Sequence, residues 1–224
     1  LVRSRGLGDV YKRQVVTNTA FFSGTTRAGS SAASYTAASC PAFVTVQNIN
    51  NSGAGSLRQA ITEVCLGGTV SFAPALTASG PNTITLANSE LSITRSLTIS
   101  GPGASLLAIS GNDSTRLFSI ANSATVAISG LTLRNGYGNY HIGAIENQGT
   151  LALSNSSLVY NRANDRYGAI YNKGVLSVTA STIAFNQAGV FGSGIANEGV
   201  ATLIDSTVMS NTTSGGVAGG VDAG

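Results

Sequence analysis

Charged side chains, aromatic side chains and long apolar runs are all scarce in this chain. Charged residues make up 9% of the 224 residues, tryptophan is absent and there is one histidine. Since charged residues usually form about a quarter of a soluble chain, this composition disfavours surface helices rich in Lys and Glu. No apolar run approaches the ~18 residues that a membrane-spanning helix needs. We therefore expect no membrane-spanning segment in this stretch.

Glycine and small strand-forming residues are abundant instead. There are 28 glycines, and Asn, Ser, Thr and Val recur throughout the chain. This mixture is typical of short strands joined by tight turns. The net charge of +3 arises within residues 1–14, and acidic and basic residues balance beyond them. We therefore do not expect nucleic acid as a partner.

The first 14 residues differ in composition from the rest of the chain. Residues 1–14, LVRSRGLGDVYKRQ, resemble a translated sequencing-adaptor scar and are expected to be disordered. Residues 15–39 are expected to be the tail of a preceding Ig-like domain or a linker. Because the sequence stops inside a repeat, we expect the coil region, residues 83–224, to be C-terminally truncated.

A regular repeat dominates the second half of the chain, with a period of about 25 residues. The words AIENQGTLAL, AIYNKGVLSV and GIANEGVATL begin at residues 144, 169 and 194. Self-similarity of this regularity indicates a solenoid. Its asparagines form two columns, Asn122, Asn147, Asn172 and Asn197 in one, and Asn161, Asn186 and Asn211 in the other.

Apolar residues alternate within each repeat, as in Leu151-x-Leu153, and show no helical period. Short alternating strands predict an all-β fold, a right-handed parallel β-helix with about 25 residues per coil. Stacked asparagines can then pass amide hydrogen bonds from coil to coil. We also expect the asparagines of the first column, and the glycines two positions later, to hold strained corner positions. Intervening residues such as Tyr171 are expected to point outward.

Residues 40–82 are predicted to form an N-terminal cap with a helix over residues 56–65. The apolar face of this helix has the spacing i, i+3, i+4 and i+7 and consists of Leu57, Ala60, Ile61 and Val64. Ser56 and Gln59 are spaced as in a capping box, and the pair of glycines at 67–68 is expected to end the helix.

The two cysteines, Cys40 and Cys65, bracket most of this cap. We predict a disulfide between them, which is typical of an extracytoplasmic protein. Two buried thiols are the alternative.

The segments NNSGAGSLRQAI, GGTVSF and LTISGPGASLLAISGNDSTRLFSI resemble the N-terminal region of bacterial right-handed β-helix surface proteins. The later 25-residue repeats, which contain GAI and N-x-G, are similar to the repeats of polymorphic outer-membrane proteins and autotransporter passengers. The resemblance covers residues 43–224. It implies an exported bacterial protein, extracellular or at the cell surface, that acts in adhesion or in contact with glycans.

Polysaccharide lyases and glycosidases share this fold, and they need facing carboxylates or acids that hold Ca²⁺. No position of the repeat holds an acidic residue in two successive repeats. We therefore expect a non-catalytic module without a cofactor. The single histidine and the two cysteines also match no metal-site spacing. The alternative is a fragment of a carbohydrate-active enzyme, pectate-lyase-like or a glycosidase, whose catalytic coils lie outside this stretch.

The richest candidate binding surface is the loop that follows the second asparagine column. Aromatic rings can stack on apolar sugar faces while Arg and Asp bind hydroxyls. The loop predicts a glycan platform made of Tyr137, Tyr140, His141, Arg162, Asp165, Arg166, Tyr167 and Phe191. In the alternative interpretation, Tyr167 and Phe191 only cover the corner and Arg162 pairs with Asp165.

Overall fold

A computed structural model describes residues 16–20, 31–35, 40–87, 89–139, 142–215 and 219–223. The chain forms two compact units, Leu1–Cys40 and Pro41–Gly224. In the first unit, β1 (Val16–Ala20) pairs with β2 (Ser31–Tyr35) in an antiparallel register. Residues 1–14 lie outside the described residues. The Ig-like origin of residues 15–39 stays a prediction.

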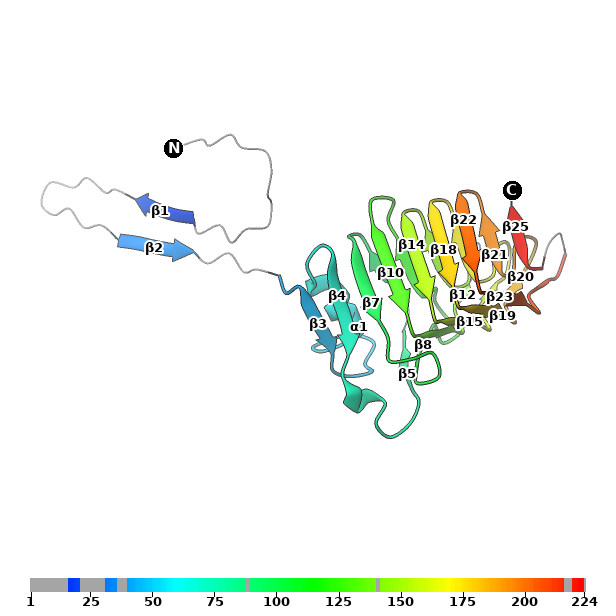
Figure 1. Ribbon diagram of the computed structural model, residues 1–224, viewed down its shortest axis with the longest axis horizontal. Helices are drawn as coiled ribbons and strands as arrows, with labels where there is room; N and C mark the ends of the chain where they lie inside the picture. Colours follow the sequence, from blue (N-terminus) through cyan, green and yellow to red (C-terminus); the bar gives the residue numbers. More distant parts are fainter. Residues whose placement is uncertain are drawn as a thin grey trace, which may run out of the picture. The chain divides into compact units, whose positions relative to one another are not determined.

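The second unit is a parallel β-solenoid of about seven turns (Figure 1). Among the described residues of this unit, four sheets run along the stack, and they are numbered I to IV below. Each turn visits them in the order I, II, IV and III where all four are present. In the regular turns each strand pairs with the equivalent strand of the next repeat, as Leu151 pairs with Leu176. The predicted all-β parallel fold is therefore confirmed, and its right-handed winding stays a prediction.

The strands of each sheet follow one another along the stack. Sheet I contains β3 (Phe43–Val46), β4 (Gly68–Phe72), β7 (Leu97–Ser100), β10 (Thr125–Ser129), β14 (Thr150–Ser154), β18 (Val175–Thr179) and β22 (Val200–Ile204). Sheet II contains β5 (Asn82–Thr85), β8 (Leu107–Ser110), β11 (Thr132–Arg134), β15 (Ser157–Val159), β19 (Thr182–Ala184) and β23 (Thr207–Met209). Sheet III contains β6 (Leu91–Ile93), β9 (Phe118–Ile120), β13 (Ile145–Asn147), β17 (Ile170–Asn172), β21 (Ile195–Asn197) and β25 (Val221–Ala223). Sheet IV contains β12 (Tyr137–Gly138), β16 (Arg162–Ala163), β20 (Gln187–Ala188) and β24 (Thr212–Thr213).

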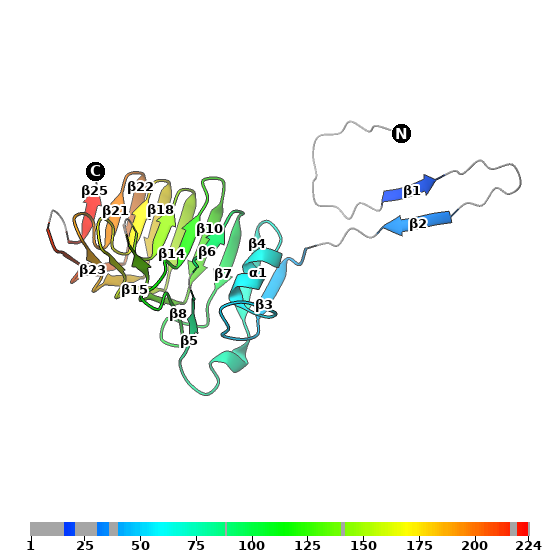
Figure 2. The same ribbon diagram turned by 180° about the vertical axis from the view of Figure 1, so that it is seen from behind.

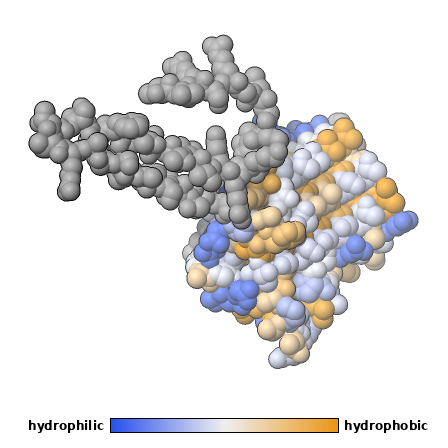
Figure 3. Space-filling model, turned by 60° about the vertical axis from the view of Figure 1, so that its left-hand side comes forward, coloured by the Kyte–Doolittle hydropathy of each residue, from blue (hydrophilic) through white to orange (hydrophobic). Residues whose placement is uncertain are grey.

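The core fills the space that the sheets enclose. Along β14 the inward residues Leu151 and Leu153 are buried, and Leu176 and Val178 lie next to them on β18. One coil has too few apolar residues to form a core, so burial depends on stacking. On the face drawn in Figure 3, apolar side chains lie in bands between polar ones.

Hydrogen-bonded side-chain ladders run along three corners of the solenoid. Ladder one, with Asn147, Asn172 and Asn197, lies between sheets III and I. Ladder two, with Asn161, Asn186 and Asn211, lies between sheets II and IV. A serine ladder between sheets I and II has the backbone N–H groups of Ser156 and Ser181 donating to the hydroxyls of Ser181 and Ser206. This serine column was not predicted from the sequence, although its spacing is the same as that of the asparagines.

The prediction that Asn122 belongs to ladder one is wrong. Ile120, not Asn122, lies opposite Asn147, and Asn122 sits exposed in a turn. The turn between β9 and β10 spans residues 121–124, whereas the turn between β13 and β14 spans only 148–149. Those extra residues move Asn122 out of the column.

The expected backbone role of the ladder residues is also wrong. Positive φ is found one residue before ladder two, at Asn135, Tyr160, Phe185 and Ser210, and not at the ladder asparagines themselves. The glycine at 174 does not have a positive φ either. A Cβ there would meet the carbonyl oxygen of Gly149 in the preceding coil, so glycine permits close stacking rather than a strained turn.

The α-helix α1 (Leu57–Glu63) packs against β3 and β4 at the end of the stack (Figure 2). Its predicted apolar face is buried. The backbone N–H of Gln59 donates to Ser56 Oγ at 3.2 Å, as predicted. Gln59 Oε1, however, accepts from the N–H of Gly55 at 2.7 Å, whereas a capping box would have it accept from the N–H of Ser56. The helix ends at Glu63, before the glycine pair.

Arg58 joins the helix to the coil that contains β6. Its guanidinium donates to the carbonyl oxygens of Glu90 at 2.6 Å and Ser89 at 2.8 Å. Arg95, just after β6, donates to the carbonyl oxygen of Thr62. The helix therefore covers the first strand of sheet III, where a solenoid edge would otherwise be open.

Cys40 and Cys65 are both disulfide-bonded. The backbone N–H of Cys65 also donates to the carbonyl oxygen of Pro41 at 2.9 Å, which brings the helix C-terminus to the start of the solenoid. Within the described ranges, no helix has the length and hydropathy needed to cross a bilayer.

Candidate functional site

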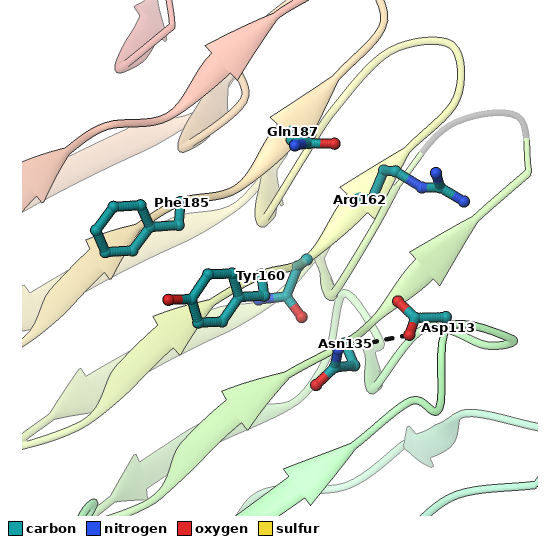
Figure 4. A pocket seen from close by; sticks show the side chains of 7 residues that line it. Asp113, Asn135, Tyr160, Arg162, Phe185 and Gln187 are labelled. Carbon is teal, nitrogen blue, oxygen red and sulfur yellow. Dashed lines mark hydrogen bonds between the residues drawn. The ribbon is translucent and has the colours of Figure 1, made fainter.

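A shallow hollow of about 370 Å³ lies on the corner between sheets II and IV. We call it the corner hollow and define it by its lining residues, Asp113, Asn135, Tyr160, Asn161, Arg162, Phe185 and Gln187. Its residues come from consecutive coils, so the hollow extends along the stack. The side chains of Tyr160 and Phe185 extend to one side and those of Arg162 and Gln187 to the other (Figure 4).

Tyr160 and Phe185 form the apolar side of the corner hollow. Their ring centroids are 5.5 Å apart and their planes differ by 12°. The two residues are 57% and 45% exposed. Two nearly parallel rings held open to solvent offer a flat apolar surface to a ligand.

The backbone at these two residues is unfavourable for aromatic side chains. Both have a φ of 57°, in the left-handed region. That conformation costs roughly 1–2 kcal/mol per residue for side chains other than Gly, and Asn and Asp tolerate it best. Asn135 holds the same column one coil earlier with a φ of 51°. The aromatic residues therefore add exposed apolar area, and more strain than Asn would, at these positions.

Arg162 and Gln187 form the polar side. They are opposite each other on β16 and β20. The Arg162 guanidinium lies 5.1 Å above the ring of Tyr137, which is opposite Arg162 on β12. This cation–π contact orients Arg162 without neutralising its charge. At the N-terminal end, Asp113 accepts a long hydrogen bond of 3.5 Å from the amide of Asn135.

The predicted platform residues are distributed over several places. Arg162 lines the corner hollow, and Tyr137 lies under its guanidinium. Asp165 forms an exposed ion pair of 3.7 Å with Arg166, rather than with Arg162 as the alternative proposed. Phe191 is 38% exposed. Tyr140 and His141 lie outside the described residues.

Tyr160 and Phe185 were not among the residues predicted for the platform. Their spacing of one repeat was the available signal, since it makes them neighbours in adjacent coils. They directly precede the buried Asn161 and Asn186 but are themselves exposed, which places them at the outer side of the same corner.

Tyr167 lies at a different place, at the start of sheet III. It forms a bridge with Ile142 and stacks on Tyr171, with ring centroids 4.2 Å apart. Tyr171 is only 8% exposed, so the expectation that it points freely outward is wrong. Burial raises the pKa of the Tyr171 phenol above its ordinary value, and the Glu198 carboxylate raises it further.

The same side of the solenoid has a charged cluster. Arg116 forms ion pairs with Glu90 at 2.7 Å and with Glu146 at 2.5 Å. Arg116, Glu90 and Glu146 come from three successive coils, since Leu91, Phe118 and Ile145 are paired. These charges are thus bound to one another along the stack, and the cluster links coils.

Fold and site together define a parallel β-solenoid with an aromatic and polar hollow along one corner. The chain matches no family model, no curated protein and no solved structure.

Proposed function

We propose that this chain is a non-catalytic, adhesin-like module of an exported bacterial protein, secreted or at the cell surface, that binds glycans through the corner hollow. The observation that carries this proposal is the exposed pair of Tyr160 and Phe185 on left-handed backbone. Neither ring contributes to the core, and each adds strain. A ligand that stacks on the rings accounts for both features.

Sugars fit the chemistry of the corner hollow. A pyranose has an apolar face that stacks on an aromatic ring and an edge of hydroxyls that needs hydrogen-bond partners. Arg162 and Gln187 supply donors opposite the rings, and Asp113 and Asn135 supply acceptors at the N-terminal end. The shallow form of the hollow suits a segment of a long glycan better than an enclosed small molecule.

Export and a surface location rest on the sequence resemblance and on the disulfide. The cap and repeat motifs resemble those of polymorphic outer-membrane proteins and autotransporter passengers. Stable disulfides are typical of proteins outside the cytoplasm. Cys40 and Cys65 are both disulfide-bonded, which supports this location.

A double substitution, Tyr160→Asn with Phe185→Asn, tests the binding role without removing a core side chain. Affinity electrophoresis through gels that contain different polysaccharides measures binding. We expect the native chain to be retarded by at least one polysaccharide and the variant by none. Because Asn suits left-handed backbone, the midpoint of urea unfolding should stay equal or rise.

Val175→Thr is the matched control. Val175 is an exposed apolar residue, 46% accessible, on sheet I, and Thr150 occupies the same column one coil earlier. Its substitution should change neither binding nor stability. Equal retardation of the native chain and the double variant would refute the proposed site.

A further inference from the structure

We infer that the glycan is acidic and that the Arg162 guanidinium binds a carboxylate or sulfate group of a sugar in the corner hollow. This inference rests on the proposed function and names its ligand class. It follows from the surroundings of the Arg162 side chain and from its place in the hollow. Arg162 is then the residue that selects for charge.

The Arg162 guanidinium is a cation without a protein partner. In the part of the chain that the structure describes, it takes part in no ion pair and donates no hydrogen bond to an oxygen. Arg116, by contrast, has two carboxylate partners, and Arg58 donates to carbonyl oxygens. The Arg162 side chain is also exposed. Its N–H groups are therefore available to an acceptor on a ligand.

The Arg162 side chain is nevertheless held in place. Its guanidinium lies 5.1 Å from the centroid of the Tyr137 ring, on the neighbouring strand β12. The Tyr137 hydroxyl accepts a hydrogen bond of 2.7 Å from the amide of Asn164 and donates one of 3.3 Å to Asn139 Oδ1. The ring is thus fixed from two sides, and the guanidinium rests on it. Because the cation is ordered before a ligand arrives, binding an anion costs less conformational entropy.

The cation is part of the same hollow as the exposed rings. Tyr160 precedes Arg162 by two residues, and Phe185 precedes Gln187 by two, in adjacent coils. The outward column of sheet IV consists of Tyr137, Arg162, Gln187 and Thr212, and of these four residues only Arg162 is charged. A glycan in the hollow can stack its apolar faces on the rings and reach Arg162 with the substituents of its ring edges (Figure 4). A guanidinium binds a carboxylate or a sulfate through two parallel hydrogen bonds, which favours an acidic sugar there.

Asp113, which also lines the hollow, does not neutralise this cation. Asp113 follows β8 and Arg162 follows β15, and β11 lies between those strands in sheet II. The two charges therefore belong to coils that are not adjacent, and Asp113 is bound to the amide of Asn135. The positive charge of Arg162 stays available to a ligand.

An acidic peptide fits this surface less well than an acidic glycan. Peptides bind to sheets mainly through main-chain hydrogen bonds at a free strand edge. Here β16 lies between β12 and β20, and β20 lies between β16 and β24, so both strands are paired on both sides. The corner hollow therefore offers side chains rather than an open edge.

Titration calorimetry at low ionic strength with two pairs of size-fractionated polymers tests this inference. Hyaluronan and its carboxyl-reduced form differ in the carboxylate, and keratan sulfate and its desulfated form differ in the sulfate. We expect the acidic member of at least one pair to bind about tenfold more tightly than its neutral counterpart. The pair that shows the difference identifies the anion. Polyglutamate, an acidic peptide, should bind more weakly than that acidic polysaccharide.

Substitutions of Arg162 show whether this residue causes the preference. Arg162→Gln should lower the affinity for the acidic polymer to about that for its neutral counterpart. Gln187 holds the same column one coil later, so the midpoint of urea unfolding should stay the same. Arg162→Lys retains the charge but not the paired hydrogen bonds, so it should keep only part of the preference.

Lys173→Gln is the matched control. Lys173 is another exposed cation, 5.0 Å from the centroid of a tyrosine ring, but it lies in the turn between sheets III and I and not in the corner hollow. Its substitution should leave every affinity unchanged.

The outcomes distinguish the two levels of the proposal. Equal affinity for the acidic and neutral members of both pairs, a preference that Arg162→Gln leaves intact, or tighter binding of polyglutamate each overturns the inference. So does absence of binding to all four polysaccharides, if another polysaccharide retards the native chain in affinity electrophoresis; glycan binding through the rings then stands. Absence of binding in both assays overturns the inference together with the proposed function.

Discussion

The two ladders consist of the same residue, asparagine, at the same spacing, but they differ in their hydrogen-bond partners. In ladder two, Asn186 Oδ1 accepts from both the backbone N–H and the side-chain amide of Asn161, at 2.9 and 3.0 Å. Its own amide donates to Asn211 Oδ1 and to the carbonyl oxygen of Leu158. The asparagines of ladder two thus form hydrogen bonds with backbone groups of the corner as well as with neighbouring asparagine side chains.

Ladder one joins side chains and carbonyl oxygens only. Asn172 accepts from the Asn147 amide at 2.7 Å and donates to Asn197 at 2.6 Å. Among the described residues, no backbone N–H donates to an oxygen of this ladder. Ladder one therefore holds coils together, whereas ladder two also completes the hydrogen bonds of a tight corner.

The ladders also begin differently. The first oxygen of ladder two, Asn161 Oδ1, accepts from the N–H of Gly136 at 2.8 Å. The first oxygen of ladder one, Asn147 Oδ1, is buried without a partner, because Ile120 occupies the column in the preceding coil. A ladder that uses backbone donors can start anywhere, but a ladder of side chains alone leaves its first acceptor empty.

The largest effect is expected for Asn186→Ala, in the middle of ladder two. The substitution leaves the buried N–H of Asn161 and the carbonyl oxygen of Leu158 without these partners. Each buried unpaired group costs about 1–3 kcal/mol, so the free energy of unfolding should fall by roughly 3–5 kcal/mol. Urea unfolding followed by circular dichroism measures this loss.

A smaller effect is expected for Asn172→Ala, in the middle of ladder one. The Asn147 amide keeps its bond to the carbonyl oxygen of Val175 at 3.0 Å, and no backbone N–H loses its partner. We expect a loss of about 2–3 kcal/mol, which is less than for Asn186→Ala. Equal losses for the two variants would contradict the distinction between the ladders.

The regular coils could be predicted from the sequence because identical residues recur at a constant spacing and so show which positions of successive coils are neighbours. Asn172 and Asn197 are one repeat apart, and the structure makes them direct neighbours. Asn122 has the same spacing but lies outside the ladder, because the longer turn after β9 shifts the register without changing the letters. Turn length depends on local backbone geometry, which a column of identical residues does not determine.

The site was less predictable than the fold. Spacing alone placed Arg162 near Tyr137, and this contact exists. Spacing also makes Tyr160 and Phe185 neighbours in adjacent coils, but it does not show that they are exposed, since a residue beside a buried asparagine points inward or outward according to the backbone of the corner. The left-handed φ at Tyr160 and Phe185 decides that direction. Tyr167 shows the same limit, because it stacks on Tyr171 rather than joining Tyr137.

The smallest effect is expected for Asn147→Ala, at the start of ladder one. The variant removes the unpaired Asn147 oxygen but leaves Asn172 Oδ1 without its donor, so the number of unpaired buried acceptors stays the same. What remains is a small cavity and the lost bond to Val175, worth about 1 kcal/mol. Urea unfolding measures the free energy of unfolding of this variant and of Asn161→Ala, the substitution at the first position of ladder two. Asn161→Ala also leaves the N–H of Gly136 without its acceptor, so it should lower the free energy of unfolding more than Asn147→Ala does. A smaller loss for Asn161→Ala would show that backbone donors do not distinguish the two ladders.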